Sequence, residues 1–275
     1  MIDIPQFETK TELFDHLVEH KNELIQQKKF EMKKADGFSF FSSAVNEKGE
    51  AVKAKPEDLM SKDSLKVKVV INTTNLLDSH SDVHMKGIWN RTVKNAKDVY
   101  LLQEHQMKFD NIIASDVKAT VQTMTWKQLG IDLKGTTEAL VFEANIEKSR
   151  NEKMFNRYAK GEVKNHSVGM QYVQLKLCIG DKRYKEERAN WDEYISEVAN
   201  VELAEEQGYF WAVTEAKMIE GSAVVKGSNY ATPTLSAKSD SSDDTHKGTR
   251  ESTTEGLDLG AIKNELSNQF SKLKN

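Results

Sequence analysis

The stretch Asn165-His166-Ser167-Val168-Gly169-Met170 joins a turn-like approach, Lys160 to Lys164, to a strand-like apolar run that continues to Leu177. A serine at the start of a strand, followed by a glycine, can present its hydroxyl while neighbouring main-chain amides stay open to an incoming carbonyl group. The same residues also suit an ordinary serine in a tight turn. The stretch therefore predicts a strand and leaves two roles open for Ser167, nucleophile or turn residue.

Hydrophobic periodicity predicts further strands and a few helices around this stretch. Val67, Val69 and Ile71 alternate with other residues, as in a strand with one buried face. Strands are predicted at 65–73, 117–125, 139–146, 168–179 and 210–219, and helices at 10–34, at 151–160 and within 181–207. The body of the chain, about 65–233, is therefore expected to be rich in strands with a few helices.

Composition limits the classes of protein to which the chain can belong. Its 275 residues, 38% hydrophobic and 30% charged, allow one large domain or two small ones. A formal net charge of −4 does not fit a general nucleic-acid binder. Apolar runs fall well short of the ~20 residues that span a bilayer. We therefore expect no nucleic acid and no membrane among the partners.

The single cysteine and the first residues point to a reducing compartment. Cys178 can form no internal disulfide, and its apolar neighbours predict a small buried hydrophobic residue. Residues 1–10 carry acidic groups and lack the apolar core of a signal peptide. A cytoplasmic location is expected.

Changes in composition divide the chain into four parts. Residues 1–64 are predicted to be a helical and polar N-terminal extension, and residues 65–235 the main domain. Residues 236–256 are Ser, Thr, Asp, Lys and Gly with almost no apolar side chains, which predicts a flexible linker. Residues 257–275 carry apolar residues at helical spacing and predict a C-terminal amphipathic helix.

A serine nucleophile needs a base, and His105 is the best placed of the seven histidines. It ends the apolar segment 99–105, which would hold its ring at the end of a buried strand. The alternative is a histidine that caps a strand at the surface. His166 adjoins Ser167, but adjacent strand residues point to opposite faces, so it is a poor partner.

A second polar group lies at Asp78, His80, Asp82 and His84. Carboxylate and imidazole ligands at these spacings could hold a divalent metal ion, which would suit a metal-dependent hydrolase. The same residues also suit a polar loop after a strand, and no His-Glu-x-x-His motif accompanies them. No metal site is assigned.

Four segments in order resemble the motifs of one protease family. The first, 82–89, looks like its acid-Val-x-x-x-Gly-small-aromatic segment, and the second, 101–105, like its apolar run that ends in a histidine. The third, 154–170, looks like its short helix, glycine and Ser-[Ile/Val]-Gly-apolar strand, and the fourth, 213–225, like its late apolar-x-Glu-x-Ser-apolar-Val strand. On these residues the body resembles the prohead (capsid-maturation) proteases of tailed bacteriophages, which are similar in fold to the herpesvirus assemblins.

The resemblance implies a serine endopeptidase with no metal or organic cofactor. Ser167 would attack the scissile carbonyl, and His105 would take its proton and pass it to the leaving amine. Glu220 is expected to orient the imidazole, because the late strand of the assemblins carries its third catalytic residue at what looks like the corresponding place. Glu215 lies five residues earlier, on the opposite face of the strand. Main-chain amides around Val168 and Gly169 are the expected oxyanion donors.

The resemblance also implies a fold, partners and a location. The fold would be α+β, a mostly antiparallel β-barrel surrounded by helices. Substrates would be the scaffolding protein, the major capsid protein and the chain itself, cut inside the procapsid in the host cytoplasm. A homodimer is a further expectation, since dimerisation activates the assemblins. The C-terminal helix could dock on scaffold or capsid protein, or pack on the body.

One alternative function fits the same features. A non-catalytic scaffold or assembly-core protein could keep a protease-like fold, and the polar linker and the terminal helix suit that role equally well. Self-processing distinguishes the two functions, because only an active protease would trim itself.

Overall fold

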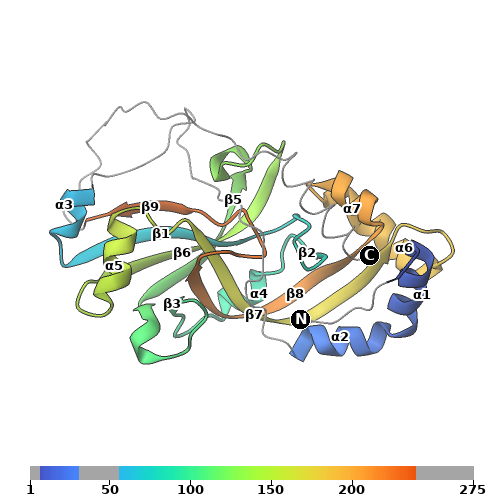
Figure 1. Ribbon diagram of the computed structural model, residues 1–275, viewed down its shortest axis with the longest axis horizontal. Coiled ribbons are helices and arrows are strands. Elements are labelled where there is room, and N and C mark those ends of the chain that lie inside the picture. Colours follow the sequence, from blue (N-terminus) through green and yellow to red (C-terminus); the bar gives the residue numbers. More distant parts are fainter. Residues whose placement is uncertain (1–6, 31–55, 240–275) are drawn as a thin grey trace.

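The computed structural model describes residues 7–30 and 56–239, which form helices packed around two β-sheets (Figure 1). The helices are α1 (Lys10–Glu19), α2 (Lys21–Phe30), α3 (Pro56–Met60), α4 (Asn90–Lys94), α5 (Glu152–Ala159), α6 (Lys185–Tyr194) and α7 (Val201–Gln207). The strands are β1 (Ser64–Thr73), β2 (Asp82–His84), β3 (Leu101–Gln103), β4 (Ile112–Ala114), β5 (Val117–Thr125), β6 (Thr136–Glu147), β7 (Asn165–Ile179), β8 (Tyr209–Val224) and β9 (Thr234–Lys238). The strands predicted from alternation all form.

The first sheet has four antiparallel strands in the order β5-β6-β1-β9. The alternation that predicted β1 is visible in its burial, since Val67, Val69 and Ile71 are all buried. β9 ends at Lys238, so its last residues lie beyond the domain boundary expected at residue 235. The rest of the expected linker and the whole of the expected helix 257–275 lie outside the described residues.

The second sheet is organised around β8. Along one edge β8 pairs with β7 in antiparallel fashion, from Asn165 opposite Val224 to Ile179 opposite Tyr209. Its other edge pairs with two short parallel strands, β2 near its beginning and β3 near its end, and β3 pairs in turn with β4. This topology places the start of β7 and the end of β3 on the two sides of the same part of β8.

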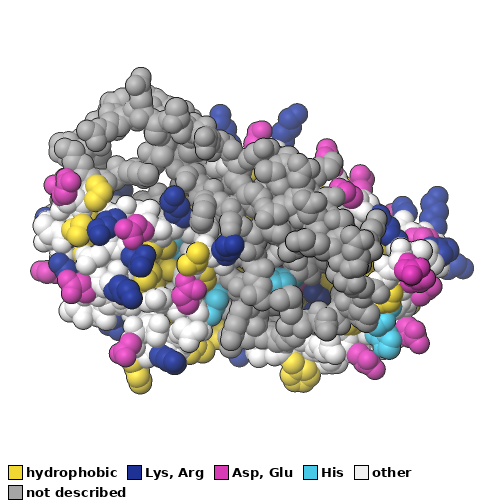
Figure 2. Space-filling view, viewed as in Figure 1, with side chains coloured by type: hydrophobic (Ala, Val, Ile, Leu, Met, Phe, Trp, Pro, Cys, Tyr) yellow, Lys and Arg dark blue, Asp and Glu magenta, His cyan; other side chains and the backbone are white. Residues whose placement is uncertain are grey.

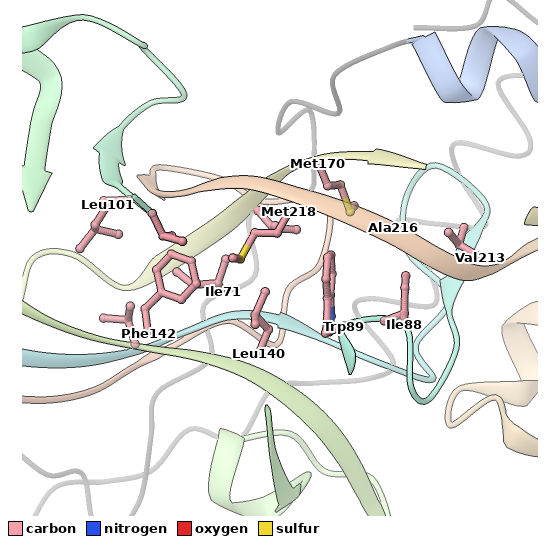
Figure 3. Packing of buried hydrophobic residues seen from close by; sticks show 14 of the residues in the cluster. Ile71, Ile88, Trp89, Leu101, Leu140, Phe142, Met170, Val213, Ala216 and Met218 are labelled. Atoms are coloured by element: carbon pink, nitrogen blue, oxygen red, sulfur yellow. The ribbon is translucent and has the colours of Figure 1, made fainter. Parts of the chain in front are cut away.

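The main hydrophobic core lies between the two sheets (Figure 3). Ile71 and Phe142 project from β1 and β6 toward Leu101 and Met218 of the second sheet, and Trp89 fills the space beside them. Each of these side chains is at least nine-tenths buried. This packing fixes the second sheet relative to the first.

The α+β class and the mostly antiparallel pairing expected from the sequence are confirmed, but a closed barrel is not formed by the described residues. β5 and β9 are the outer strands of the first sheet, and β4 is an outer strand of the second. No strand of one sheet pairs with a strand of the other in residues 56–239. The number of strands in a sequence does not determine which strands pair. The closed barrel expected from the resemblance is therefore replaced by two separate sheets in the described residues.

The N-terminal helices pack on the far end of the β7–β8 pair, beside α6 (Figure 1). One long helix was expected at 10–34; residues 10–30 form two helices that meet at His20, and residues 31–34 lie outside the described residues. Thr9 begins α1 with a capping box, in which its side chain and that of Glu12 bond each other's main-chain N–H groups. Phe14 contacts the rings of Tyr184 and Tyr209 edge-on, which anchors α1 to the body.

Charged side chains of both signs intermingle at both ends of the face seen in Figure 2. Lysines and acidic residues are also interleaved along the sequence, a pattern typical of a solvated surface. None of the helices in the described part of the chain is long and apolar enough to cross a membrane.

Candidate functional site

His105 lies in a strained turn that follows β3. Glu104 and His105 have φ values of 53° and 54°, in the left-handed region that non-glycine residues rarely adopt. The N–H of Gln106 donates to the carbonyl of Gln103 at 3.0 Å, which closes the turn around them. Each left-handed residue costs about 1–2 kcal/mol, and such strain gathers at functional sites. His105 was expected at the end of a buried strand; it lies two residues beyond β3.

The imidazole of His105 is held by the carboxylate of Glu220. His105 Nδ1 lies 2.6 Å from Glu220 Oε1, and the two side chains are only 4% and 1% exposed. Nδ1–H donates to the carboxylate, which leaves Nε2 as the acceptor of the neutral ring. Nε2 is buried and has no hydrogen-bond partner among the described residues. The ring is therefore oriented at one nitrogen and lacks a hydrogen-bond partner at the other, an arrangement suited to a general base.

A third side chain, Ser222, joins this pair. Its hydroxyl donates to Glu220 Oε2 at 2.6 Å and accepts from the main-chain N–H of His105 at 3.1 Å. Sequence reasoning named Ser222 only as part of a motif and gave it no role. The available signal was its spacing, because residues two apart on a strand project from the same face and Glu220 was already a candidate.

Gly169 makes room for the carboxylate of Glu220. The two residues lie opposite each other in the β7–β8 pair. A Cβ atom at position 169 would overlap Glu220 Oε1 and press on the rest of the carboxyl group. Gly169, two residues after the candidate nucleophile, therefore leaves the space that the Glu220 side chain occupies.

The strand register brings Ser167 to the same face as the other candidates. Ser167 lies directly opposite Ser222, and residues directly opposite each other in an antiparallel pair project from one face. Glu220 shares that face with Ser222, and the His105 ring lies there because it bonds Glu220. Ser167 does not form a hydrogen bond with His105 Nε2. In proteins without bound substrate, the distance between nucleophile and base is often too long for such a bond. The structure thus gathers Ser167, His105 and Glu220 on one face of the sheet.

The main chain of Val168 points its N–H away from β8. Val168 lies opposite Gly221, whose own N–H donates to Tyr100 on the far side, so the Val168–Gly221 pair exchanges no hydrogen bonds. Two residues earlier, the N–H of His166 points the same way and donates to Thr232. Because successive N–H groups of a strand point to opposite sides, the N–H of Gly169 points toward β8 instead. Of the two expected oxyanion donors, the geometry favours Val168.

His166 faces away from Ser167 and has its own partners. Its Nδ1–H donates to the carbonyl of Thr232 at 3.1 Å, and its Nε2 accepts from the Tyr158 hydroxyl at 2.9 Å. Complete burial lowers the pKa of His166 from 6.5 to about 4, although the bond to Thr232 opposes the shift. His166 is therefore neutral near pH 7 and plays a structural role, consistent with the expectation that it would not serve Ser167.

Three other candidates from the sequence, Glu215, Asp82 and His84, lie elsewhere. Glu215 forms an ion pair with the exposed Arg91 at 2.8 Å, so it belongs to the surface. Asp82 is buried between the ammonium of Lys28, at 2.5 Å, and the hydroxyl of Tyr172, at 2.7 Å. His84 bonds the same Tyr172 hydroxyl at 3.1 Å.

This arrangement does not fit the metal site considered for Asp78, His80, Asp82 and His84. A cation, the Lys28 ammonium, already lies against the Asp82 carboxylate. Within residues 7–30 and 56–239, no three His, Cys, Asp or Glu side chains are grouped so that they could hold a metal ion.

The candidate site is therefore a buried His105–Glu220 pair, tied together by Ser222, on the face of the sheet from which Ser167 projects. A carboxylate–imidazole pair whose second nitrogen has no hydrogen-bond partner among the described residues is suited to accept a proton from a hydroxyl group. Comparisons of the chain with known protein families, with curated proteins and with solved structures give no match.

Proposed function

We propose that the protein is a serine endopeptidase in which Ser167 is the nucleophile, His105 the general base and Glu220 the residue that orients the base. One observation carries the proposal. The Glu220 carboxylate holds His105 by Nδ1 and leaves Nε2 without a partner among the described residues, on the face shared with Ser167. A purely structural histidine of this chain, His166, has both of its ring nitrogens bonded.

The reaction follows from these positions. The Ser167 oxygen attacks the carbonyl carbon of a peptide bond while its proton passes to His105 Nε2. The imidazolium then gives that proton to the leaving amine, and the C–N bond breaks to leave an acyl group on Ser167. A water molecule, deprotonated by the same nitrogen, hydrolyses the ester and restores the hydroxyl. Glu220 stabilises the imidazolium in both steps, and the N–H of Val168 is positioned for the oxyanion.

The proposed substrates are those of a prohead maturation protease. They are a scaffolding protein, the major capsid protein and the chain itself, cut inside a procapsid in the host cytoplasm. The active form is proposed to be a homodimer, and its fold to be related to that of the assemblins. The support for this part is the order of the four motifs in the sequence. Three of them contribute His105, Ser167 and Glu220 to the candidate site.

Two measurements test the proposal. The wild type and Ser167→Ala are expressed side by side and their masses compared, and both purified proteins are treated with a fluorophosphonate, which labels activated serines. The wild type is expected to trim itself and to carry the label on Ser167, and the variant to stay full length and unlabelled. Ser196→Ala, a change at an exposed serine, is the matched control and should behave as the wild type.

The proposal fails if the wild type neither trims itself nor takes up the label. It also fails if Ser167→Ala or His105→Ala is trimmed and labelled as fast as the wild type. In either case the non-catalytic assembly protein becomes the better account of the chain.

A further inference from the structure

We infer that Ser222 is a positioning residue that fixes both the base and the carboxylate of this site. The effect on catalysis rests on the proposed function, whereas the effect on the geometry of His105 does not. Ser222 is completely buried and lies on β8, two residues after Glu220 and directly opposite Ser167. Its hydroxyl lies between the carboxylate of Glu220 and the main chain of His105 and bonds both.

The hydroxyl of Ser222 uses its donor and an acceptor position at the same time. Its one proton goes to Glu220 Oε2 at 2.6 Å, and its oxygen accepts the main-chain N–H of His105 at 3.1 Å. Glu220 then has one oxygen bonded to Ser222 and the other bonded to His105 Nδ1. Since both oxygens are bonded, the carboxyl group cannot rotate without loss of a hydrogen bond.

The bond to the His105 main chain bears on the strained turn. His105 keeps a φ of 54° although it is not a glycine, and strained residues persist only where their surroundings hold them. The N–H of the preceding residue, Glu104, donates to the carbonyl of Ala223, so two successive residues of β8 fasten the turn. Without the Ser222 hydroxyl, the His105 N–H and one carboxylate oxygen would be buried without this partner.

Ser222 therefore acts through other residues. Its hydroxyl bonds Glu220 and the main chain of His105, and through these two bonds it sets the distance and angle at which Glu220 meets His105. A misplacement of about 1 Å in a catalytic geometry can lower a rate by ~10²-fold. Ser222→Ala should therefore lower the rate of fluorophosphonate labelling of Ser167 by about 10- to 100-fold.

The experiment compares Ser222→Ala with Ser222→Thr, which keeps the hydroxyl. Labelling rates, thermal midpoints and ¹⁵N spectra of histidine-labelled protein are measured for the wild type and both variants. In the wild type, His105 should be protonated at Nδ1 and not at Nε2, and His105→Gln assigns the signal. Ser222→Ala should shift His105 toward a mixture of tautomers, and Ser222→Thr should restore both the Nδ1 tautomer and most of the labelling rate.

The outcomes separate this inference from the proposed function. If Ser222→Ala remains folded with an unchanged His105 tautomer and an unchanged labelling rate, the inference is wrong and the peptidase proposal stands. If the wild type is never labelled but Ser222→Ala changes the tautomer, the positioning role holds and the peptidase proposal fails. If Ser222→Ala does not fold, Ser222→Thr decides: a folded threonine variant with the wild-type tautomer supports the inference, and one with a lost Nδ1 tautomer overturns it.

Discussion

The Glu220 carboxylate occupies the space in which a side chain at position 169 would begin. Gly169→Ala should therefore push the carboxylate away from His105 and abolish the fluorophosphonate labelling of Ser167. Overpacking at a buried site costs about 1–3 kcal/mol, so the free energy of unfolding should also fall. Urea unfolding and labelling rates measure the two effects.

A double variant checks that Glu220 is the cause. The cost in stability of Gly169→Ala should be smaller in a Glu220→Ala background, because the group that clashes is gone. Equal costs in the two backgrounds would mean that the new methyl group meets something else.

Glu220→Gln and Glu215→Gln should differ sharply in activity. The first variant keeps the shape of the side chain but removes the charge that stabilises an imidazolium at His105, so activity should fall by at least ~10²-fold without vanishing. Glu215 lies in a surface ion pair with Arg91, and its replacement should leave activity within a factor of about 2. Self-processing rates of the two variants compare them directly, and equal losses would remove Glu220 from its proposed role.

His166 should make the protein less stable in mild acid. Its pKa is about 4 in the folded state against 6.5 for an ordinary histidine, so below pH 6.5 the unfolded chain takes up a proton that the folded chain does not. The free energy of unfolding should therefore fall as the pH drops from 6.5 to 4, by about 3 kcal/mol in total from this residue.

Urea unfolding at a series of pH values in this range measures the slope. His166→Gln should flatten it, whereas Ser196→Ala, a change at an exposed residue that does not titrate, should not. A slope that survives the His166 change unaltered would assign the acid sensitivity to other groups.

The buried ion pair between Lys28 and Asp82 should matter for stability. Lys28→Met removes the cation from a carboxylate that is completely buried, a change that typically costs about 3–5 kcal/mol. The double variant Lys28→Met, Asp82→Asn should recover much of the loss, because neither member of the pair then carries a buried charge. Lys62→Met, at an exposed lysine, is the control. Thermal or urea unfolding of the four proteins provides the comparison, and a Lys28 variant as stable as the control would refute the claim.

Local patterns in the sequence predicted the five longest strands, β1, β5, β6, β7 and β8, but not how the strands pair. Alternation predicted β1, and the resemblance of four ordered segments to the prohead proteases singled out His105, Ser167 and Glu220. The pairing of Glu220 with Gly169 depends on the register of β7 against β8, which no local pattern encodes. The closed barrel was expected from the resemblance alone and is not formed by the described residues, because strand pairing depends on packing across the whole molecule.

Two buried polar residues, Lys28 and Ser222, were not predicted because the sequence around each is typical of a residue without a special role. Lys28 belongs to a run of charged residues on a helix, which reads as a solvated face, yet its ammonium lies against the buried Asp82. Ser222 looks like a small residue within an apolar strand, and only the position of His105 beside it reveals what its hydroxyl binds.

The packing of α1 and α2 on the body means that the recombinant protein has to include both helices. Phe14, Leu17 and Leu24 are buried against the end of the molecule that α6 and the outer parts of β7 and β8 form. A fragment that starts after residue 55 would expose the apolar surface that these helices cover. It would also leave the buried Asp82 carboxylate without the ammonium of Lys28. Such a fragment should self-associate and precipitate, so preparations for assay or crystallisation need residues 7–30 in place.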